Sequence, residues 1–95
     1  MASPSTLSAA DRAKVRELLS LGYPERAGLR LDEVKVASVR PETRLSFNSP
    51  VRVMAWTLTV RAQCRDGRNY AGDIELFQWP EEGWELVHDG LSHQR

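Results

Sequence analysis

The sequence predicts a single α+β domain in which one N-terminal helix packs on a curved antiparallel sheet of about four strands. Three observations support this fold class: helical periodicity with capping residues near the N-terminus, a long alternating segment at 51–64, and a hairpin signal directly after it. A chain of 95 residues has room for one hydrophobic core. We therefore treat residues 1–95 as one domain, with residues 1–6 as a mobile N-terminus and residues 90–95 as a mobile tail.

The helix is predicted to begin at Ser8 and to end near Leu21. Ser8 is a favoured N-cap residue, and Asp11 stands three positions later, where a capping box places an acidic side chain. Gly22 can adopt the left-handed conformation that ends a helix, and Pro24 prevents its continuation. The apolar stripe of this helix consists of Val15, Leu18, Leu19 and Leu21.

Residues 29–40 predict a first strand, because apolar and polar residues partly alternate and β-branched residues are frequent. This strand is expected to end before Pro41. The following segment, 41–50, places Leu45 and Phe47 between turn-forming residues. It forms either a short strand or a packed loop, and the sequence leaves both open.

Residues 51–64 predict a long strand, because apolar residues occupy every second position on one face. That core face consists of Met54, Trp56, Leu58, Val60, Ala62 and Cys64. A final strand is predicted at 84–88, after the turn formed by residues 80–83.

The hairpin after residue 64 has two conceivable registers. A two-residue loop would place Glu75 opposite Leu58 and so bury a carboxylate against the core. A three-residue loop, with Gly67 in the left-handed position, instead places Ile74 opposite Leu58 and Leu76 opposite Trp56. We predict the second register.

This register predicts an apolar end on the opposite face of the sheet. One helix of roughly 14 residues is about 20 Å long and covers only one face. The apolar end is then either an exposed interface for a homodimer or a protein partner, or it is covered by residues 41–50 or the C-terminal tail. Its residues are Val53, Ala55, Phe77 and Trp79. A small non-catalytic binding or assembly domain is the leading functional interpretation.

The other end of the same face is polar, with Thr57, Thr59, Arg61, Asp73 and Glu75. Two carboxylates beside an arginine could perform acid–base chemistry or bind a ligand if they were desolvated in a pocket. A minimal enzyme or ligand-binding protein is therefore an alternative. Whether the chain is an enzyme stays uncertain, and a non-enzyme is favoured.

Other chemistry has little support in the sequence. His88 and His93 match no metal-binding spacing, and Cys64, the single cysteine, falls on the core face as a buried thiol. We expect no metal site, no cofactor and no catalytic residue. A mixture of arginines and an aromatic residue supports nucleic-acid binding as a second alternative; the residues are Arg52, Arg61, Arg65, Arg68 and Tyr70.

Charge and hydropathy limit partners and location. The net charge is zero, with a basic excess in residues 1–70 and an acidic excess in residues 71–95, so nucleic acid is an unlikely partner. No apolar stretch reaches the length of a signal-peptide core or a membrane span. We expect a soluble, cytoplasmic protein that does not contact membranes.

The run from Gly83 to Ser92, Gly-Trp-Glu-Leu-Val-His-Asp-Gly-Leu-Ser, is similar to the last strand of the ketosteroid-isomerase-like (nuclear transport factor 2-like) superfamily. The order of a helix followed by long antiparallel strands also resembles that superfamily over most of the chain. The resemblance implies a cystatin-like fold and dimers formed through the outer sheet face. Enzymes of the superfamily enclose a pocket between the sheet and several helices. Since only one helix is predicted here, no family catalytic residue is assigned to this chain.

Overall fold

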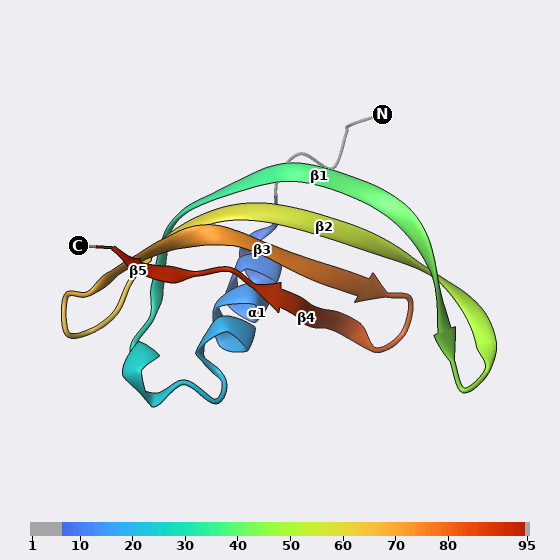
Figure 1. Cartoon of the computed structure of the whole chain (residues 1–95), viewed down its shortest axis with the longest axis horizontal. Helices are drawn as coiled ribbons and strands as arrows, with labels where there is room; N and C mark the ends of the chain where they lie inside the picture. The colour runs from blue at the N-terminus through green and yellow to red at the C-terminus, as the bar shows by residue number, and fades with distance from the viewer. Residues whose placement is uncertain (1–6, 95) are drawn as a thin grey trace.

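One α-helix, a short 3₁₀ turn and five strands make up the part of the chain that the computed structural model describes, residues 7–94 (Figure 1). The elements are α1 (Ala9–Ser20), η1 (Pro24–Arg26), β1 (Arg30–Ser46), β2 (Ser49–Gln63), β3 (Asn69–Trp79), β4 (Gly83–Asp89) and β5 (Ser92–Gln94). The strands form one antiparallel sheet in the order β1-β2-β3-β4, and β5 also pairs with β3. The expectation for residues 1–6 lies outside the described residues.

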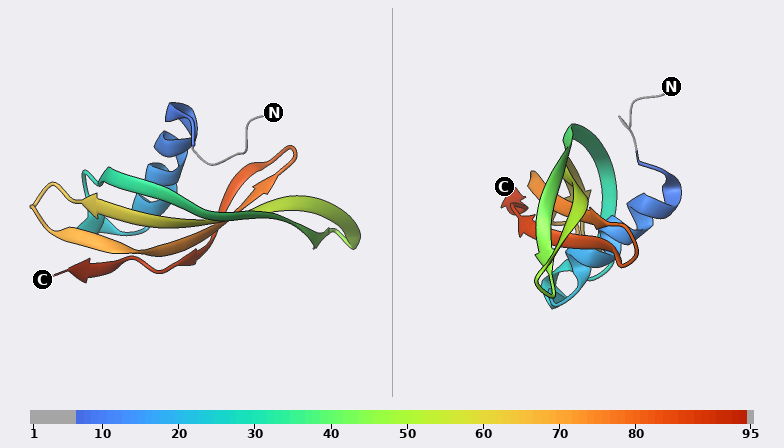
Figure 2. Two further views of the ribbon diagram at one scale, coloured as in Figure 1. Left: turned by 90° about the horizontal axis from the view of Figure 1, so that it is seen from above. Right: turned by 90° about the vertical axis from the view of Figure 1, so that its right-hand side faces the viewer.

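The sheet arches over α1, which lies against one of its faces (Figures 1 and 2). The predicted α+β class, with one helix on an open antiparallel sheet, is confirmed. None of the helices in residues 7–94 is long and apolar enough to cross a membrane.

The helix begins as predicted, because Ser8 Oγ accepts a hydrogen bond from the backbone N–H of Asp11 at 3.1 Å. Val15 and Leu19 are fully buried against the sheet. Leu21, however, was assigned to the apolar stripe and is 70 % exposed. The helix ends at Ser20 and the backbone of Leu21 is extended, so its side chain no longer follows the helical face.

The predicted register of β2 and β3 is confirmed. Leu58 pairs with Ile74, and Trp56 pairs with Leu76. The connecting loop has three residues, with Gly67 at φ 88°, and the backbone N–H of Cys64 donates to the carbonyl of Arg68 at 2.9 Å. The alternation of residues 51–64 therefore places the apolar positions toward α1, as expected.

The prediction that the first strand ends before Pro41 is wrong. β1 continues through Pro41 to Ser46 and pairs with β2 along its whole length. Proline is tolerated here because β1 is an edge strand, where an amide that faces away from β2 needs no partner strand. Residues 41–50 are thus the end of a long hairpin, closed by a two-residue turn in which Phe47 and Asn48 have φ of 51° and 64°.

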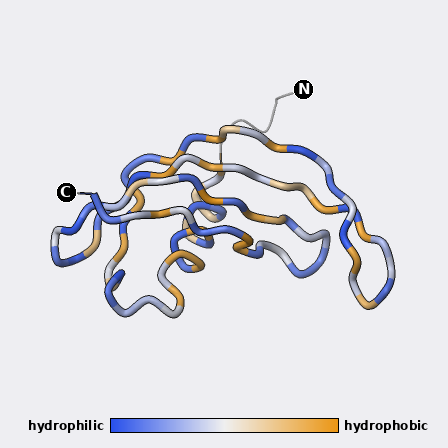
Figure 3. Tube along the Cα trace, viewed as in Figure 1, coloured by the Kyte–Doolittle hydropathy of each residue, from blue (hydrophilic) through white to orange (hydrophobic). Residues whose placement is uncertain are grey.

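This hairpin extends past its neighbours. The pairing of β2 with β3 ends at Met54, whereas the pairing of β1 with β2 continues to Ser46 and Ser49. Residues 43–52 therefore project as a two-stranded ribbon, which we call the arm. The arm curls away at the right of Figure 1, in green, and apolar positions continue toward its turn (Figure 3).

The C-terminal residues, expected to be a mobile tail, include β5, which pairs with the start of β3. Gly90 lies close against β3, and its backbone N–H donates to the carbonyl of Asp73 at 3.0 Å. A Cβ atom added to Gly72 would overlap the Gly90 carbonyl oxygen, so both glycines are needed for this close approach. Leu91 is buried beside them.

A buried ion pair fastens the loop after α1 to the end of β4. The Arg26 guanidinium donates to Asp89 Oδ2 at 2.6 Å and to the carbonyl of Leu19 at 3.0 Å, and it lies over the Tyr23 ring at 4.2 Å. Burial alone lowers the pKa of Arg26, but the hydrogen bond and charge of Asp89 outweigh burial and raise it. The buried guanidinium is therefore charged, and the carboxylate of Asp89 stabilises that charge.

Candidate functional site

The apolar end of the outer sheet face is a small second core. Val53, Ala55 and Phe77 form one cluster separate from the core beneath α1, and each is at most 5 % exposed. Trp79 packs against this cluster and is only partly buried. Of the four predicted interface residues, three are therefore inaccessible in the single chain and one reaches the surface.

Charged side chains of β1 cover this cluster. The Arg44 guanidinium lies over the Phe77 ring, 4.6 Å from its centroid. Glu42 pairs with Arg44 at 2.9 Å and with Arg40 at 3.0 Å, and Glu42 stands opposite Val53 in the sheet. The sequence left open whether this apolar end is an exposed interface or is covered by another part of the chain. These contacts correspond to coverage by residues 41–50.

The polar end does not form a shared catalytic cavity. Asp73 accepts a hydrogen bond from Thr59 Oγ1 at 2.9 Å, and Glu75 lies 3.8 Å from Arg40. Arg61 instead pairs with Glu33 of β1 at 3.7 Å. Thr57 stands opposite Glu75 in the sheet. The two carboxylates therefore interact with separate neighbours.

Arg61 also lines a pocket of about 300 Å³, but neither Asp73 nor Glu75 contributes to it. Its other lining residues come from β1, the β2–β3 hairpin and β5: Asp32, Ala62, Asn69, Tyr70, Ala71 and Gln94. The geometry at this end is that of an ion-paired, solvated sheet face.

The tip of the arm carries the most exposed apolar side chains of the described chain. Phe47 is 98 % exposed and Leu45 is 72 % exposed. Phe47 also adopts a left-handed backbone conformation that aromatic residues rarely adopt. The sequence signal for this turn was Asn48, which tolerates positive φ, but without a glycine beside it the hairpin turn was not recognised.

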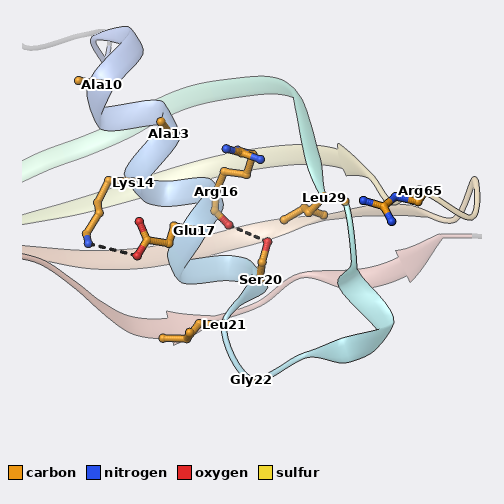
Figure 4. Close-up of a pocket in the computed structure, with 11 residues that line it drawn as sticks. Ala10, Ala13, Lys14, Arg16, Glu17, Ser20, Leu21, Gly22, Leu29 and Arg65 are labelled. Carbon is orange, nitrogen blue, oxygen red and sulfur yellow. Dashed lines mark hydrogen bonds and ion pairs between the residues drawn. The ribbon is translucent and has the colours of Figure 1, made fainter.

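A cleft lies beside α1 (Figure 4). The loop after α1 and the β2–β3 hairpin, which border it, lie toward the left of Figure 1, and the arm lies at the right. The cleft has a volume of about 790 Å³ and lies between the helix, the loop that follows it and Arg65 of the β2–β3 hairpin. Its apolar lining is Ala10, Ala13, Leu21 and Leu29. Lys14 and Glu17 at its rim form an ion pair at 3.6 Å.

The remaining sequence candidates are structural. Cys64 is buried, and burial raises the pKa of its thiol, so the thiol is neutral and shielded. Tyr70 is buried and cannot serve as a stacking platform for a base, and Arg68 pairs with Asp66 at 3.2 Å. Within residues 7–94 no three histidine, cysteine or acidic side chains are grouped to hold a metal ion.

Comparison with known proteins identifies no relative. No family model matches the sequence, and neither the curated proteins nor the solved structures give a significant match.

Proposed function

We propose that this chain is a small non-catalytic binding and assembly domain that forms a homodimer through its arm. The observation that carries the proposal is Phe47, an almost fully exposed aromatic side chain at the end of a projecting hairpin. Leu45, 72 % exposed, accompanies it at the arm tip, and large buried aromatic side chains are frequent anchors of protein contacts.

The arm is expected to add little stability to an isolated chain, because it is an unsupported ribbon with exposed apolar side chains. At about 3.3 Å per residue it projects roughly 15 Å beyond the end of the β2–β3 pairing. A two-stranded ribbon without further support is only marginally stable in water. Burying one phenylalanine side chain contributes about 1.5–3 kcal/mol. A partner that covers Phe47 and Leu45 would therefore both stabilise the arm and gain affinity.

A second copy of the chain offers a surface of suitable chemistry. The arm tip, residues 45–50, has no charged residue, and the cleft beside α1 presents apolar residues, including the exposed side chain of Leu21, between the charged Lys14, Arg16, Glu17 and Arg65. The β2–β3 hairpin and the loop after α1, which border the cleft, lie toward the opposite end of the molecule from the arm (Figure 2). Reciprocal insertion of each arm into the partner's cleft gives a closed two-fold interface in which both features are used twice.

The proposal changes the role of the apolar end of the outer sheet face. Val53, Ala55 and Phe77 support the base of the arm from within, and Trp79 completes that support at the surface. We propose no catalytic role for Asp73, Glu75 and Arg61, because their contacts are with separate neighbours.

Two further parts of the proposal concern the fold and its setting. We propose that the arched sheet is cystatin-like, as the resemblance of residues 83–92 to the ketosteroid-isomerase-like superfamily implies. We also propose a cytoplasmic location, because the single buried thiol of Cys64 is compatible with a reducing compartment.

The test is the solution mass of the wild type and three variants by light scattering. Phe47→Asn removes the anchor but suits the left-handed turn, so we expect a folded monomer. Leu21→Asn alters the cleft at the other end and is expected to weaken the dimer as well. Val87→Asn is the matched control, since Val87 is an exposed apolar residue of β4, and this variant should remain dimeric. A Phe47→Asn protein with the mass of a wild-type dimer would refute the proposal.

A further inference from the structure

A second, smaller pocket lies between Ser46, near the end of the arm, and the β3–β4 turn. Its volume is about 270 Å³, and it is lined by Ser46, Trp79, Glu82, Trp84 and Glu85. It is separate from the cleft beside α1, with which it shares no lining residue. Its residues come from three separate segments of the chain, so no local sequence pattern indicates it.

The pocket is strongly acidic. Its lining includes the exposed carboxylates of Glu82 and Glu85, and the exposed Glu81 precedes them in the β3–β4 turn without lining the pocket. Among the ion pairs formed by the described residues, none involves these three carboxylates. Of the two basic residues of the arm, Arg44 is paired with Glu42 and stacked on Phe77, and neither Arg44 nor Arg52 lines the pocket. The pocket therefore presents negative charge that the described chain does not neutralise.

An aromatic ring completes the site. The indole N–H of Trp79 donates to Glu85 Oε1 at 2.9 Å, which fixes the ring beside a carboxylate. The Trp84 ring also lines the pocket, but it packs against Trp56 and its N–H donates to Asp11 at 3.3 Å. Trp79 is the pocket tryptophan whose N–H is bound by a pocket carboxylate.

A tryptophan ring next to carboxylates is the arrangement that recognises organic cations, since the ring face attracts positive charge and the carboxylates add Coulombic attraction. A metal ion is a poorer match, because the described acidic side chains are not grouped as a set of metal ligands. We propose that the pocket formed by Trp79, Glu82 and Glu85 binds an alkylammonium or guanidinium group. This inference does not depend on the proposed dimer.

The test is a titration followed by the indole N–H signals in a ¹H–¹⁵N spectrum, with the Trp79 signal assigned by its loss in Trp79→Phe. We expect tetramethylammonium chloride to shift the Trp79 signal selectively. Sodium chloride at equal ionic strength should not shift it. Neither should tert-butanol, a neutral molecule of similar size and shape. An equal shift with sodium chloride or tert-butanol would overturn the proposal.

The carboxylates are tested with variants that keep their shape. Glu82→Gln and Glu85→Gln should each weaken tetramethylammonium binding by about 2–5-fold, as expected for an exposed cation site. Glu25→Gln, an exposed carboxylate on η1, is the control and should bind as the wild type does. Unchanged binding in both pocket variants would overturn the proposal even if Trp79→Phe failed to fold.

The source of the cation is distinguished by comparing probes. A capped lysine or arginine peptide that binds at least 10-fold more tightly than tetramethylammonium indicates a side chain of a protein partner. Equal or weaker binding of the peptides indicates a free small-molecule cation. Absence of a selective shift with every cationic probe would contradict the inference, whatever the solution mass of the protein.

Discussion

Asp89→Ala is expected to destabilise the domain by about 3 kcal/mol, because it leaves the Arg26 charge buried without its partner. The side chains of Arg26 and Asp89 are only 7 % and 12 % exposed. Breaking such a pair costs about 3–5 kcal/mol, and the low end applies because Arg26 keeps its bond to the Leu19 carbonyl and its contact with Tyr23. In a domain of this size the loss corresponds to a fall in Tm of about 12–24 °C.

Urea unfolding measures this loss directly, with an unchanged slope showing that the unfolded state is not altered. Asp32→Ala is the control, because Asp32 pairs with Arg30 at the exposed surface and its loss should cost no more than about 0.5 kcal/mol. The double variant Arg26→Met/Asp89→Leu removes both charges and should recover most of the stability. A loss below about 1 kcal/mol in Asp89→Ala would refute the view that this pair fastens the loop after α1.

Three further predictions concern other parts of the fold. Because burial raises the pKa of the Cys64 thiol, the folded state holds the thiol proton more tightly than the unfolded state does. The free energy of unfolding should therefore be unaffected by this group below about pH 9 and should decline as the pH rises further. Urea unfolding at several pH values should show a smaller alkaline decline in Cys64→Ala. Gly72→Ala should cost more than about 2 kcal/mol and speed hydrogen exchange of the β5 amides, because its Cβ meets the Gly90 carbonyl, whereas Gly67→Ala, with open space, should cost about 1 kcal/mol. Single-stranded oligonucleotides should cause no mobility shift at low salt, since the net charge is zero; a shift that weakens with salt would contradict this.

The central part of the sheet was predictable because two independent signals agree there. The alternation of residues 51–64 fixed which face is apolar, and avoiding buried carboxylates then required the three-residue loop at Gly67. The Ser8 cap and the Gly22 stop predicted the helix for similar reasons, since both are local contacts between residues close in sequence.

Features that depend on contacts distant in sequence were not predictable. Pro41 argued for the end of a strand, and only the position of β1 at the sheet edge explains why the strand continues. Arg26 follows a proline in a polar loop and gives no sign of burial, because its partner Asp89 is 63 residues away. The β5 strand depends on the close approach of Gly90 to β3, which no pattern in the tail encodes.

The candidate site was predicted in its location but not in its accessible residues. The register correctly indicated an apolar end of the outer sheet face at Ala55 and Phe77. That these residues are covered by Arg44 follows from the length and curl of the arm, which sequence periodicity does not report. The exposed position of Phe47 follows from the same arm, so coverage of one apolar surface and exposure of another have a common structural cause.

The most direct measurement is the solution mass of the wild-type protein by light scattering over a wide concentration range, paired with that of Phe47→Asn. We expect a wild-type dimer and a folded Phe47→Asn monomer, since in the proposed dimer the arm tip carries the apolar contact between the two copies. Dimerisation through the arm is refuted if the wild type remains monomeric at every concentration, or if Phe47→Asn dimerises as strongly as the wild type.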